Sequence, residues 1–371
     1  MRCRRCACFH DQVLLQFTDQ SLTKLPIQVL DYRPGLGSPI EWRSVLKALL
    51  RLSKSTGLYP SRLHLGNVVQ KGHSPVAGGG FGDVYRGSVN NHDVAIKVFR
   101  VFSATNMEKF KKTMWKEVII WCQLYHANVL PCYGVYHVPT QPHHIGLVSP
   151  WIRKGNVVEY LRENPTTQRT LLLLDIASGM SYLHENKIVH GDLKGENILV
   201  SESGRACLVD FGLSKLSDPA LLGWTSIQTR STGNGGTTQW QAPEMFNADA
   251  EANATAMTDV YSYGCVCYEI MTGKIPFFEI KRIFVIPTLV SRGDRPRKPD
   301  LNDPAYKEYG LTDRIWEFIE MSWNQNPYLR PTAQELEKSA VLTSLTDNRP
   351  VQQWGNPSSA EFRRWMFEPF A

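Results

Sequence analysis

Short apolar runs bounded by glycines dominate residues 63 to 100, a pattern that predicts β-strands. Val76–Gly87 places a glycine cluster between two strand-like segments, and Asp93–Phe99 follows at hairpin distance. Glycines let a backbone approach a polyphosphate closely, although many glycine-rich hairpins are only structural. Lys97 lies among apolar residues, so we expect its ammonium group in a largely buried cleft with an anionic partner, the alternative being an exposed strand face.

A helix over Asn106–Tyr125 is predicted by apolar residues at helical spacing. The stripe consists of Phe110, Met114, Val118, Trp121 and Leu124 or Tyr125. Glu117 lies at the edge of this stripe and points toward whatever the helix packs on. A glutamate at such an edge usually reaches solvent, so its pairing with Lys97 is a joint hypothesis.

A second helix, over Ile40–Ser53, has an apolar and a basic face. The apolar face carries Trp42, Val45, Leu46, Leu49 and Leu50, and the basic face carries Arg43, Lys47 and Arg51. Such a helix can make weak contacts with a membrane or an acidic partner, but packing on the neighbouring domain is the favoured interpretation. Residues 1–65 are expected to form an N-terminal extension that contains this helix.

The stretch Ile188–Val200 has an apolar run, a tight polar loop and a second apolar run. The loop presents Asp192, Lys194 and Asn197, and Asp210 follows a further apolar segment. A carboxylate can orient a hydroxyl, a lysine can hold a phosphate, and an amide oxygen can ligate a hard metal ion. These are the parts that phosphoryl transfer requires.

Composition narrows the class of protein without naming a function. The chain has 371 residues, of which 42% are hydrophobic and 20% charged, as expected of a soluble globular protein. The formal charge of +6 comes from scattered residues and predicts no nucleic-acid partner. The eight cysteines suggest no disulfide framework, and the apolar runs are too short for a transmembrane segment. We therefore expect a cytoplasmic protein, with a nuclear location as the alternative.

Taken together and in order, these motifs resemble the eukaryotic protein kinase superfamily. The matching segments are Ala77–Val84, Val94–Lys97, Glu117, His190–Asn197, Asp210–Gly212, Ala242–Glu244, Asp259–Gly264 and Arg330, which in the family pairs with Glu244. Lys194 and the Gly236–Thr237 stretch look like the serine/threonine type, and Trp323 before Arg330-Pro331 looks like the tyrosine-kinase-like branch. A fungal source is an impression from the same resemblance.

The resemblance implies an α+β, bilobal kinase fold over residues 70–345. The small N-lobe, about 70–149, would hold a five-stranded antiparallel sheet and one main helix. The C-lobe, about 152–345, would be larger and mostly helical, with a buried central helix that starts near Asp259. Beyond the resemblance, we expect residues 346–371 to form a C-terminal tail that carries Trp354, Trp365 and Phe370 and can dock on the large lobe, the alternative being a partner-binding role.

The resemblance also implies roles for individual residues, with ATP and Mg²⁺ as cofactors and Ser/Thr hydroxyls of proteins as substrates. Lys97, oriented by Glu117, would hold the α- and β-phosphates, and Asn197 and Asp210 would ligate Mg²⁺. Asp192 would accept or orient the substrate hydroxyl proton, and Lys194 would steady the γ-phosphate. The nucleotide would be contacted by Ala77, Gly78, Gly79, Gly80, Phe81, Gly82, Val84, Ala95, Lys97, Leu199 and the hinge residues Ser149, Pro150 and Trp151.

Two positions depart from the family pattern. Gly191 stands where the family has an arginine that binds an activation-segment phosphate, so we predict activity that depends less on phosphorylation of that segment. Ala77 replaces the first loop glycine, and we expect only a modest effect on ATP affinity. The Ser- and Thr-rich segment Asp210–Glu244 is interpreted equally well as regulatory or as merely flexible.

Two functions of different class stay open. The first is an active Mg²⁺- and ATP-dependent protein kinase with a signalling role. The second is a pseudokinase, a nucleotide-binding scaffold that signals by shape alone. Pseudokinases usually lack at least one of the residues Lys97, Glu117, Asp192, Asn197 and Asp210, and all five are present here. This favours the active kinase.

Overall fold

The computed structural model divides the chain into two compact units, each described by itself. The small unit comprises Met1–Leu124, Cys132–Ser149 and Gly355–Ala371, and the large unit comprises Tyr125–Pro131 and Pro150–Trp354. The residues that the structure describes are 46, 49–51, 53, 59–60, 63–79, 82–99, 115, 118–138, 144–211, 238–247, 254–352, 354 and 362. Within them, no helix is long and apolar enough to cross a membrane.

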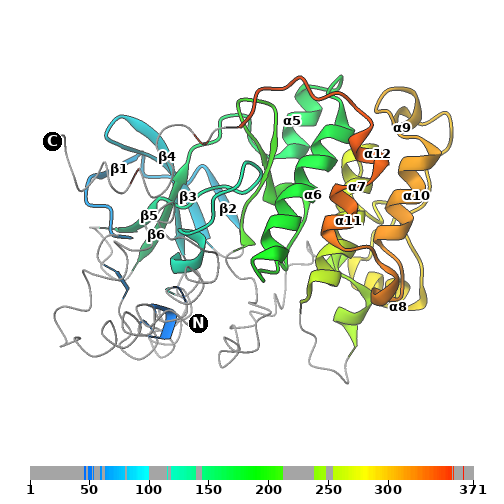
Figure 1. Cartoon of the computed structure of the whole chain (residues 1–371), viewed down its shortest axis with the longest axis horizontal. Helices are drawn as coiled ribbons and strands as arrows, with labels where there is room; N and C mark the ends of the chain where they lie inside the picture. The colour runs from blue at the N-terminus through cyan, green and yellow to red at the C-terminus, as the bar shows by residue number, and fades with distance from the viewer. Residues whose placement is uncertain are drawn as a thin grey trace, which may run out of the picture. The chain divides into compact units, whose positions relative to one another are not determined.

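A β-sheet with the order β1-β3-β4-β6-β5 organises the small unit, and β2 also pairs with β3 (Figure 1). Its strands are β1 (Val68–Lys71), β2 (Ala77–Gly79), β3 (Gly82–Val89), β4 (His92–Phe99), β5 (Gly134–His137) and β6 (Ile145–Pro150). The described part of this unit has six strands where five were predicted, because β1 and β2 pair in turn with β3. The break between them contains Gly72, at φ +85°, and Pro75, which cannot donate a ladder hydrogen bond.

The turn and the side-chain alternation of β3 and β4 follow directly from the sequence. Asn90 and Asn91 join the strands with φ of +45° and +67°, the positive values that a two-residue hairpin turn favours. On β4, Val94, Ile96 and Val98 are buried in a hydrophobic core, whereas Ala95 and Lys97 between them are half-buried. The strand therefore presents one apolar face to the core and a second, mixed face on which Lys97 lies.

Both predicted helices of this unit have helical residues in the described part of the chain. Leu46, Leu49 and Leu50 are helical and buried, and Arg51 is helical and exposed, which matches the amphipathic pattern. In the second helix, Val118–Trp121 is helical and buried. The predicted end at Tyr125 is wrong, because Cys122 and Gln123 form a turn and Tyr125 is 55% exposed. Weak membrane or partner contact by the helix near residues 40–53 stays a prediction.

The large unit is mostly helical (Figure 1). Its described residues contain one small sheet, in which β7 and β8 pair antiparallel. Its longer elements are α5 (Val157–Glu163), α6 (Arg169–Glu185), β7 (Ile198–Val200), β8 (Ala206–Leu208), α7 (Ala256–Thr272), α8 (Ile286–Arg292) and α10 (Asp313–Ser322). The shorter helices are α9 (Pro304–Lys307), α11 (Ala333–Glu337) and α12 (Ala340–Thr343), with 3₁₀ turns η4 (Gly195–Asn197), η6 (Thr238–Trp240), η7 (Pro243–Phe246), η8 (Ile283–Val285) and η9 (Pro327–Leu329).

Helix α7 is the buried central helix that was predicted. It begins with a capping box between Thr255 and Thr258 and ends at Gly273, which adopts the left-handed conformation at φ +69°. Cys265 and Cys267 on this helix are fully buried, and burial raises the pKa of both thiols. They therefore pack in the core and are not reactive groups.

Candidate active site

Asp192 and Asn197 are hydrogen-bonded to each other in the loop between α6 and β7. The Asn197 Nδ2 donates to the Asp192 backbone oxygen at 2.7 Å and to the Asp192 Oδ2 at 3.0 Å. These bonds fix the rotamer of the carboxylate and commit the amide nitrogen, so the amide oxygen points the other way. The carboxylate is half-buried and the amide is buried, which makes a preorganised polar pair.

The backbone of the same loop is held by Asp259, at the start of α7. The Asp259 Oδ2 accepts from the His190 backbone N–H at 2.7 Å, and Oδ1 accepts from the Gly191 N–H at 2.8 Å. His184 Nε2 lies 2.8 Å from Oδ2 as well. Because Asp259 is only 1% exposed, its carboxylate fixes the backbone just before Asp192 from within the core.

Burial and charge act on Asp192 in opposite directions. Burial raises the pKa of the Asp192 carboxyl, and Lys194, His190 and Asn197 oppose that rise. The Lys194 Nζ is 3.9 Å from the Asp192 Oδ2 and 3.2 Å from the Glu196 Oε2. The Asp192 N–H donates to Nδ1 of His190, whose own pKa is lowered by burial, so the imidazole is a neutral acceptor.

Glu269 and Trp240 hold the second half of the loop, and sequence reasoning did not find Glu269. The Glu269 Oε2 accepts from the Gly195 N–H at 3.0 Å and from the Trp240 Nε1 at 3.0 Å. A Cβ on Gly195 would lie 2.8 Å from the Glu269 carboxyl, so only glycine permits this approach. A lone carboxylate inside the apolar run of α7 is the signal that could have pointed to Glu269.

Asp210, the second predicted metal ligand, adopts a backbone conformation uncommon for a residue with a side chain. Its φ is +63°, in the left-handed region, and strained residues of this kind cluster at functional sites. Phe211, which follows, is buried, and its ring meets the His190 ring edge-on at 6.1 Å. Gly212 lies outside the described residues.

The small unit brings three of the predicted nucleotide-binding residues onto one face of its sheet. Val84 on β3 is the register partner of Lys97 on β4, and Ala95 lies two residues from Lys97 on the same strand. Gly82 passes so close to the neighbouring strand that a Cβ would lie 2.3 Å from the Val98 backbone oxygen. The arrangement places the lysine beside two small apolar side chains, as a site for a flat ring and its phosphates requires.

The other residues predicted to contact the nucleotide belong to both units, and some of them lie outside the described residues. Ala77, Gly78 and Gly79 form β2, Leu199 is half-buried on β7, and the chain passes from the small to the large unit between Ser149 and Pro150, at the predicted hinge. Trp151 is half-buried. Gly80, Phe81 and Glu117 lie outside the described residues. The predicted pairing of Glu117 with Lys97 therefore stays a prediction.

The predicted pair of Arg330 and Glu244 is confirmed. The guanidinium binds both carboxylate oxygens, with Nη1 to Oε1 at 2.6 Å and Nη2 to Oε2 at 2.8 Å. Arg330 is 4% exposed and also donates to the backbone oxygens of Met257 and Asn324. This bidentate pair connects Ala242–Glu244, the segment matched to the end of the activation segment, to the loop after α10.

Comparison with known proteins identifies the family. A model of the protein tyrosine and serine/threonine kinase family matches residues 71–340. The chain belongs to this family. This match confirms the predicted bilobal α+β kinase fold and the protein kinase superfamily, and the match and the similar proteins together support the tyrosine-kinase-like branch. The fungal source stays a prediction.

The similar proteins carry serine/threonine kinase names. Serine/threonine-protein kinase STY46 of Arabidopsis thaliana is 32% identical over 250 residues, covering 66% of this chain and 40% of that protein. RGS domain-containing serine/threonine-protein kinase A of Dictyostelium discoideum is 32% identical over 266 residues, 70% of this chain and 21% of that protein. Human serine/threonine-protein kinase TNNI3K is 29% identical over 344 residues, 88% of this chain and 39% of that protein. The chain thus spans less than half the length of these relatives.

The residues predicted to bind Mg²⁺ fit that ion by the chemistry of their donors. Mg²⁺ prefers hard oxygen ligands and usually takes only one or two from the protein, with the rest from phosphates and water. Asn197 offers an amide oxygen whose orientation is set by the two bonds of its Nδ2, and Asp210 offers a carboxylate. A kinase of this family uses such an ion to neutralise phosphate charge.

Proposed function

We propose that this chain is an ATP- and Mg²⁺-dependent protein kinase that phosphorylates Ser and Thr hydroxyls of proteins in a signalling role. The observation that carries the proposal is the preorganised pair of Asp192 and Asn197, whose loop backbone is held by Asp259 and Glu269. A structural loop has no need of a half-buried carboxylate held in one orientation. Family membership and the names of the relatives support the same conclusion.

In this proposal Asp192 is the group that receives the substrate. Its oriented carboxylate accepts the hydrogen bond of the substrate hydroxyl and then its proton, and a pKa raised by burial makes it a better base. Lys194, held near Asp192 by charge, binds the transferred phosphoryl group. Asn197 and Asp210 would hold Mg²⁺, which would supply positive charge to the phosphates when bound. On the small unit, Lys97 binds the α- and β-phosphates beside Val84 and Ala95.

The test is a phosphorylation assay with Mg²⁺ and ATP on a peptide array, comparing the wild type with Asp192→Asn. Asparagine keeps the size of the side chain and one acceptor for Asn197, so we expect the fold to survive while transfer falls by at least about 100-fold. Glu317→Gln, on an exposed residue of α10, is the matched control and should leave the rate unchanged.

Assays on the same two proteins also distinguish the active kinase from the pseudokinase scaffold, which the comparisons do not favour. A thermal shift on adding ATP and Mg²⁺, with no transfer by the wild type above the Asp192→Asn background, would overturn the proposal and support the scaffold. Phosphate found mainly on tyrosine would retain the kinase and reject the Ser/Thr assignment.

A further inference from the structure

The described residues beyond the family match are bound to the rest of the chain and do not form a loose tail. The side chains alternate between half-buried and exposed from Leu345 to Pro350, with Asp347 and Arg349 turned inward and Thr346 and Asn348 outward. An alternation with period two is typical of an extended segment laid along a surface. The family model ends at residue 340, so nothing in the family match assigns this segment a place.

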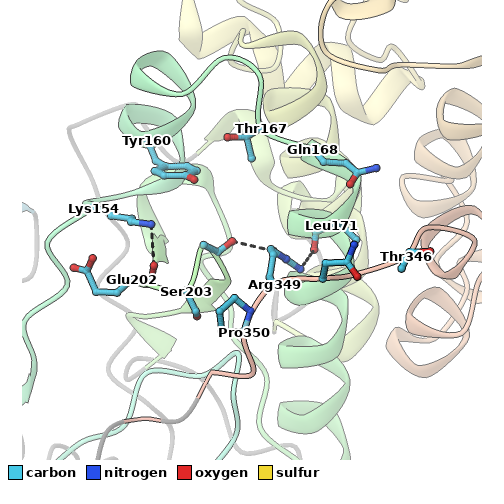
Figure 2. Close-up of a pocket in the computed structure, with 12 residues that line it drawn as sticks. Lys154, Tyr160, Thr167, Gln168, Leu171, Glu202, Ser203, Thr346, Arg349 and Pro350 are labelled. Carbon is cyan, nitrogen blue, oxygen red and sulfur yellow. Dashed lines mark hydrogen bonds between the residues drawn. The ribbon is translucent and has the colours of Figure 1, made fainter.

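Arg349 is the first anchor, and it is bound by the large unit. Its Nη1 donates to the Asp175 Oδ2 on α6 at 2.8 Å and to the Gly204 oxygen at 2.9 Å. Its Nη2 donates to the Leu171 oxygen at 3.3 Å and to the Asp347 Oδ2 at 3.0 Å. Figure 2 shows the side chain pointing between the turn near Ser203 and helix α6. Asp175 is 3% exposed, so the cation neutralises a carboxylate that would otherwise be buried with one fewer partner.

Arg205, in the turn before β8, fixes the same stretch from the other side. It donates to the Asp347 Oδ2 at 2.8 Å, to the Arg349 oxygen at 3.0 Å and to the Pro350 oxygen at 2.7 Å. Two arginines and two aspartates thus balance their charges and satisfy backbone oxygens of the segment as well. The segment also walls one side of a hollow of about 550 Å³ that Lys154, Tyr160 and Gln168 line opposite it (Figure 2).

Trp354 is the second contact with the large unit. It is 6% exposed, and its Nε1 donates to the His126 backbone oxygen at 2.7 Å. Gln352, two residues before Trp354, accepts from the Ser203 hydroxyl at 2.5 Å. A buried tryptophan with its N–H satisfied is a strong apolar anchor, so the large unit holds the segment from Asp347 to Trp354.

Phe362, only eight residues later, is part of the core of the small unit. It is 1% exposed and stacks on the Tyr133 ring, with centroids 4.0 Å apart and planes 7° from parallel. The same core contains Val94 and Ile96 of β4 and Val148 of β6. A phenylalanine buried this completely removes a large apolar area from water, so it contributes to the stability of the sheet.

We propose that the C-terminal part of the chain docks intramolecularly, anchored in the large unit by Arg349 and Trp354 and in the small unit by Phe362. Each unit completes its own packing with a piece of the C-terminal segment, and the occupant of the Tyr133 surface is Phe362 of this chain. The packed kinase domain therefore extends about twenty residues beyond the family match. A tail docked on the large lobe alone, as predicted from sequence, accounts for Trp354 and not for Phe362.

The first test uses point variants of the full chain and hydrogen–deuterium exchange. Phe362→Ala should speed exchange in β1, β3 and β4 and leave α6 unchanged, whereas Arg349→Ala should speed exchange in the first half of α6 and the β7–β8 turn. Val351→Ala is the matched control within the segment, because Val351 is 76% exposed. If Phe362→Ala exchanges like the control, or affects both units equally, the two-anchor proposal is overturned.

The second test removes the segment and returns it in trans. A chain of residues 1–345 should unfold at least about 5 °C below the full chain and should bind a labelled peptide of residues 346–371 saturably. The intact chain should not bind the peptide, since its own segment occupies the surfaces. An unchanged midpoint, or equal binding by both chains, would reject the proposal, and if the shortened chain fails to fold the point variants decide. None of these measurements depends on phosphoryl transfer, so they stand apart from the proposed function.

Discussion

Gly191 combines a missing side chain with a backbone that a side chain would strain. The family resemblance identifies it as the position of a phosphate-binding arginine, and the structure adds that its φ is +78°. Left-handed conformations disfavour residues with a Cβ by roughly 1–2 kcal/mol. Space is not the obstacle, because a Cβ added at this position would have the Ala254 Cβ as its nearest neighbour, at 3.7 Å. The backbone conformation, and not crowding, therefore favours glycine here.

We expect Gly191→Arg to lower the free energy of unfolding by about 1–2 kcal/mol, measured by urea unfolding. Turnover should fall as well, since the Gly191 N–H bond to Asp259 lies directly before Asp192. Gly66→Ala is the control, because a Cβ there meets nothing within 4 Å and its φ is ordinary. A Gly191→Arg variant as stable as the Gly66→Ala variant would show that the loop relaxes without strain.

Glu269 is a buried acid whose ionisation makes stability depend on pH. Burial raises the pKa of its carboxyl to about 7, partly opposed by the Gly195 and Trp240 hydrogen bonds, from 4.5 for an exposed glutamate. A raised folded-state pKa means that the unfolded chain releases the proton first as pH increases. The stabilisation is therefore fully present below pH 4.5 and is lost as pH rises through about 7.

Glu269→Gln stays neutral at every pH and isolates this effect. At pH 5 the free energies of unfolding of the two proteins should be similar, and by pH 8 the wild type should lose on the order of 3 kcal/mol relative to the variant. Urea unfolding at several pH values measures the difference, with Glu317→Gln on α10 as the exposed control. A difference between wild type and Glu269→Gln that does not vary with pH would contradict the raised pKa.

Helix α7 organises the catalytic loop at the level of elements. Its Asp259 binds the backbone before Asp192 and its Glu269 binds the backbone after Lys194, so one helix fixes both halves of the loop. The family resemblance predicted α7 as a buried helix, and residue types predicted the loop as a polar turn, because motifs and residue types are local signals. The contacts join residues 68 to 74 positions apart, and no local pattern reports them.

Asp259→Asn tests whether this support matters for catalysis. Asparagine has one acceptor oxygen where the carboxylate accepts from His190, Gly191 and His184, so at least one buried N–H loses its partner. We expect a loss of about 1–3 kcal/mol in the free energy of unfolding. In steady-state kinetics, kcat should fall by at least about tenfold while the KM for ATP changes little, because Asp259 acts on the loop that carries Asp192. A rise in KM at constant kcat would contradict this role.

At the scale of the whole molecule, the sequence predicted the architecture better than the boundaries of individual helices and strands. The ordered motifs from Ala77 to Arg330 predicted the kinase fold, because each motif needs specific side chains at fixed spacing. Hydrophobic periodicity did not report the break between β1 and β2 or the early helix end before Tyr125, since turns depend on a few dihedral angles. Phe362 was missed altogether, because a single aromatic residue after the large unit gives no periodic signal.

The glycine at position 191 also leads to a prediction about how the activity of the whole domain is regulated. In the family, an arginine at this position binds a phosphate on the activation segment and orders that segment. Gly191 offers no such cation, and the backbone of the catalytic loop is held by hydrogen bonds to Asp259 and Glu269. Replacement of all Ser and Thr residues between 214 and 238 by alanine should therefore keep turnover within about threefold of the wild type, a change of under about 1 kcal/mol in the activation barrier. Phosphatase treatment of the wild type should have as little effect. Circular dichroism confirms folding of the variant, and a folded variant that has lost its activity would show that the segment is switched by another cation.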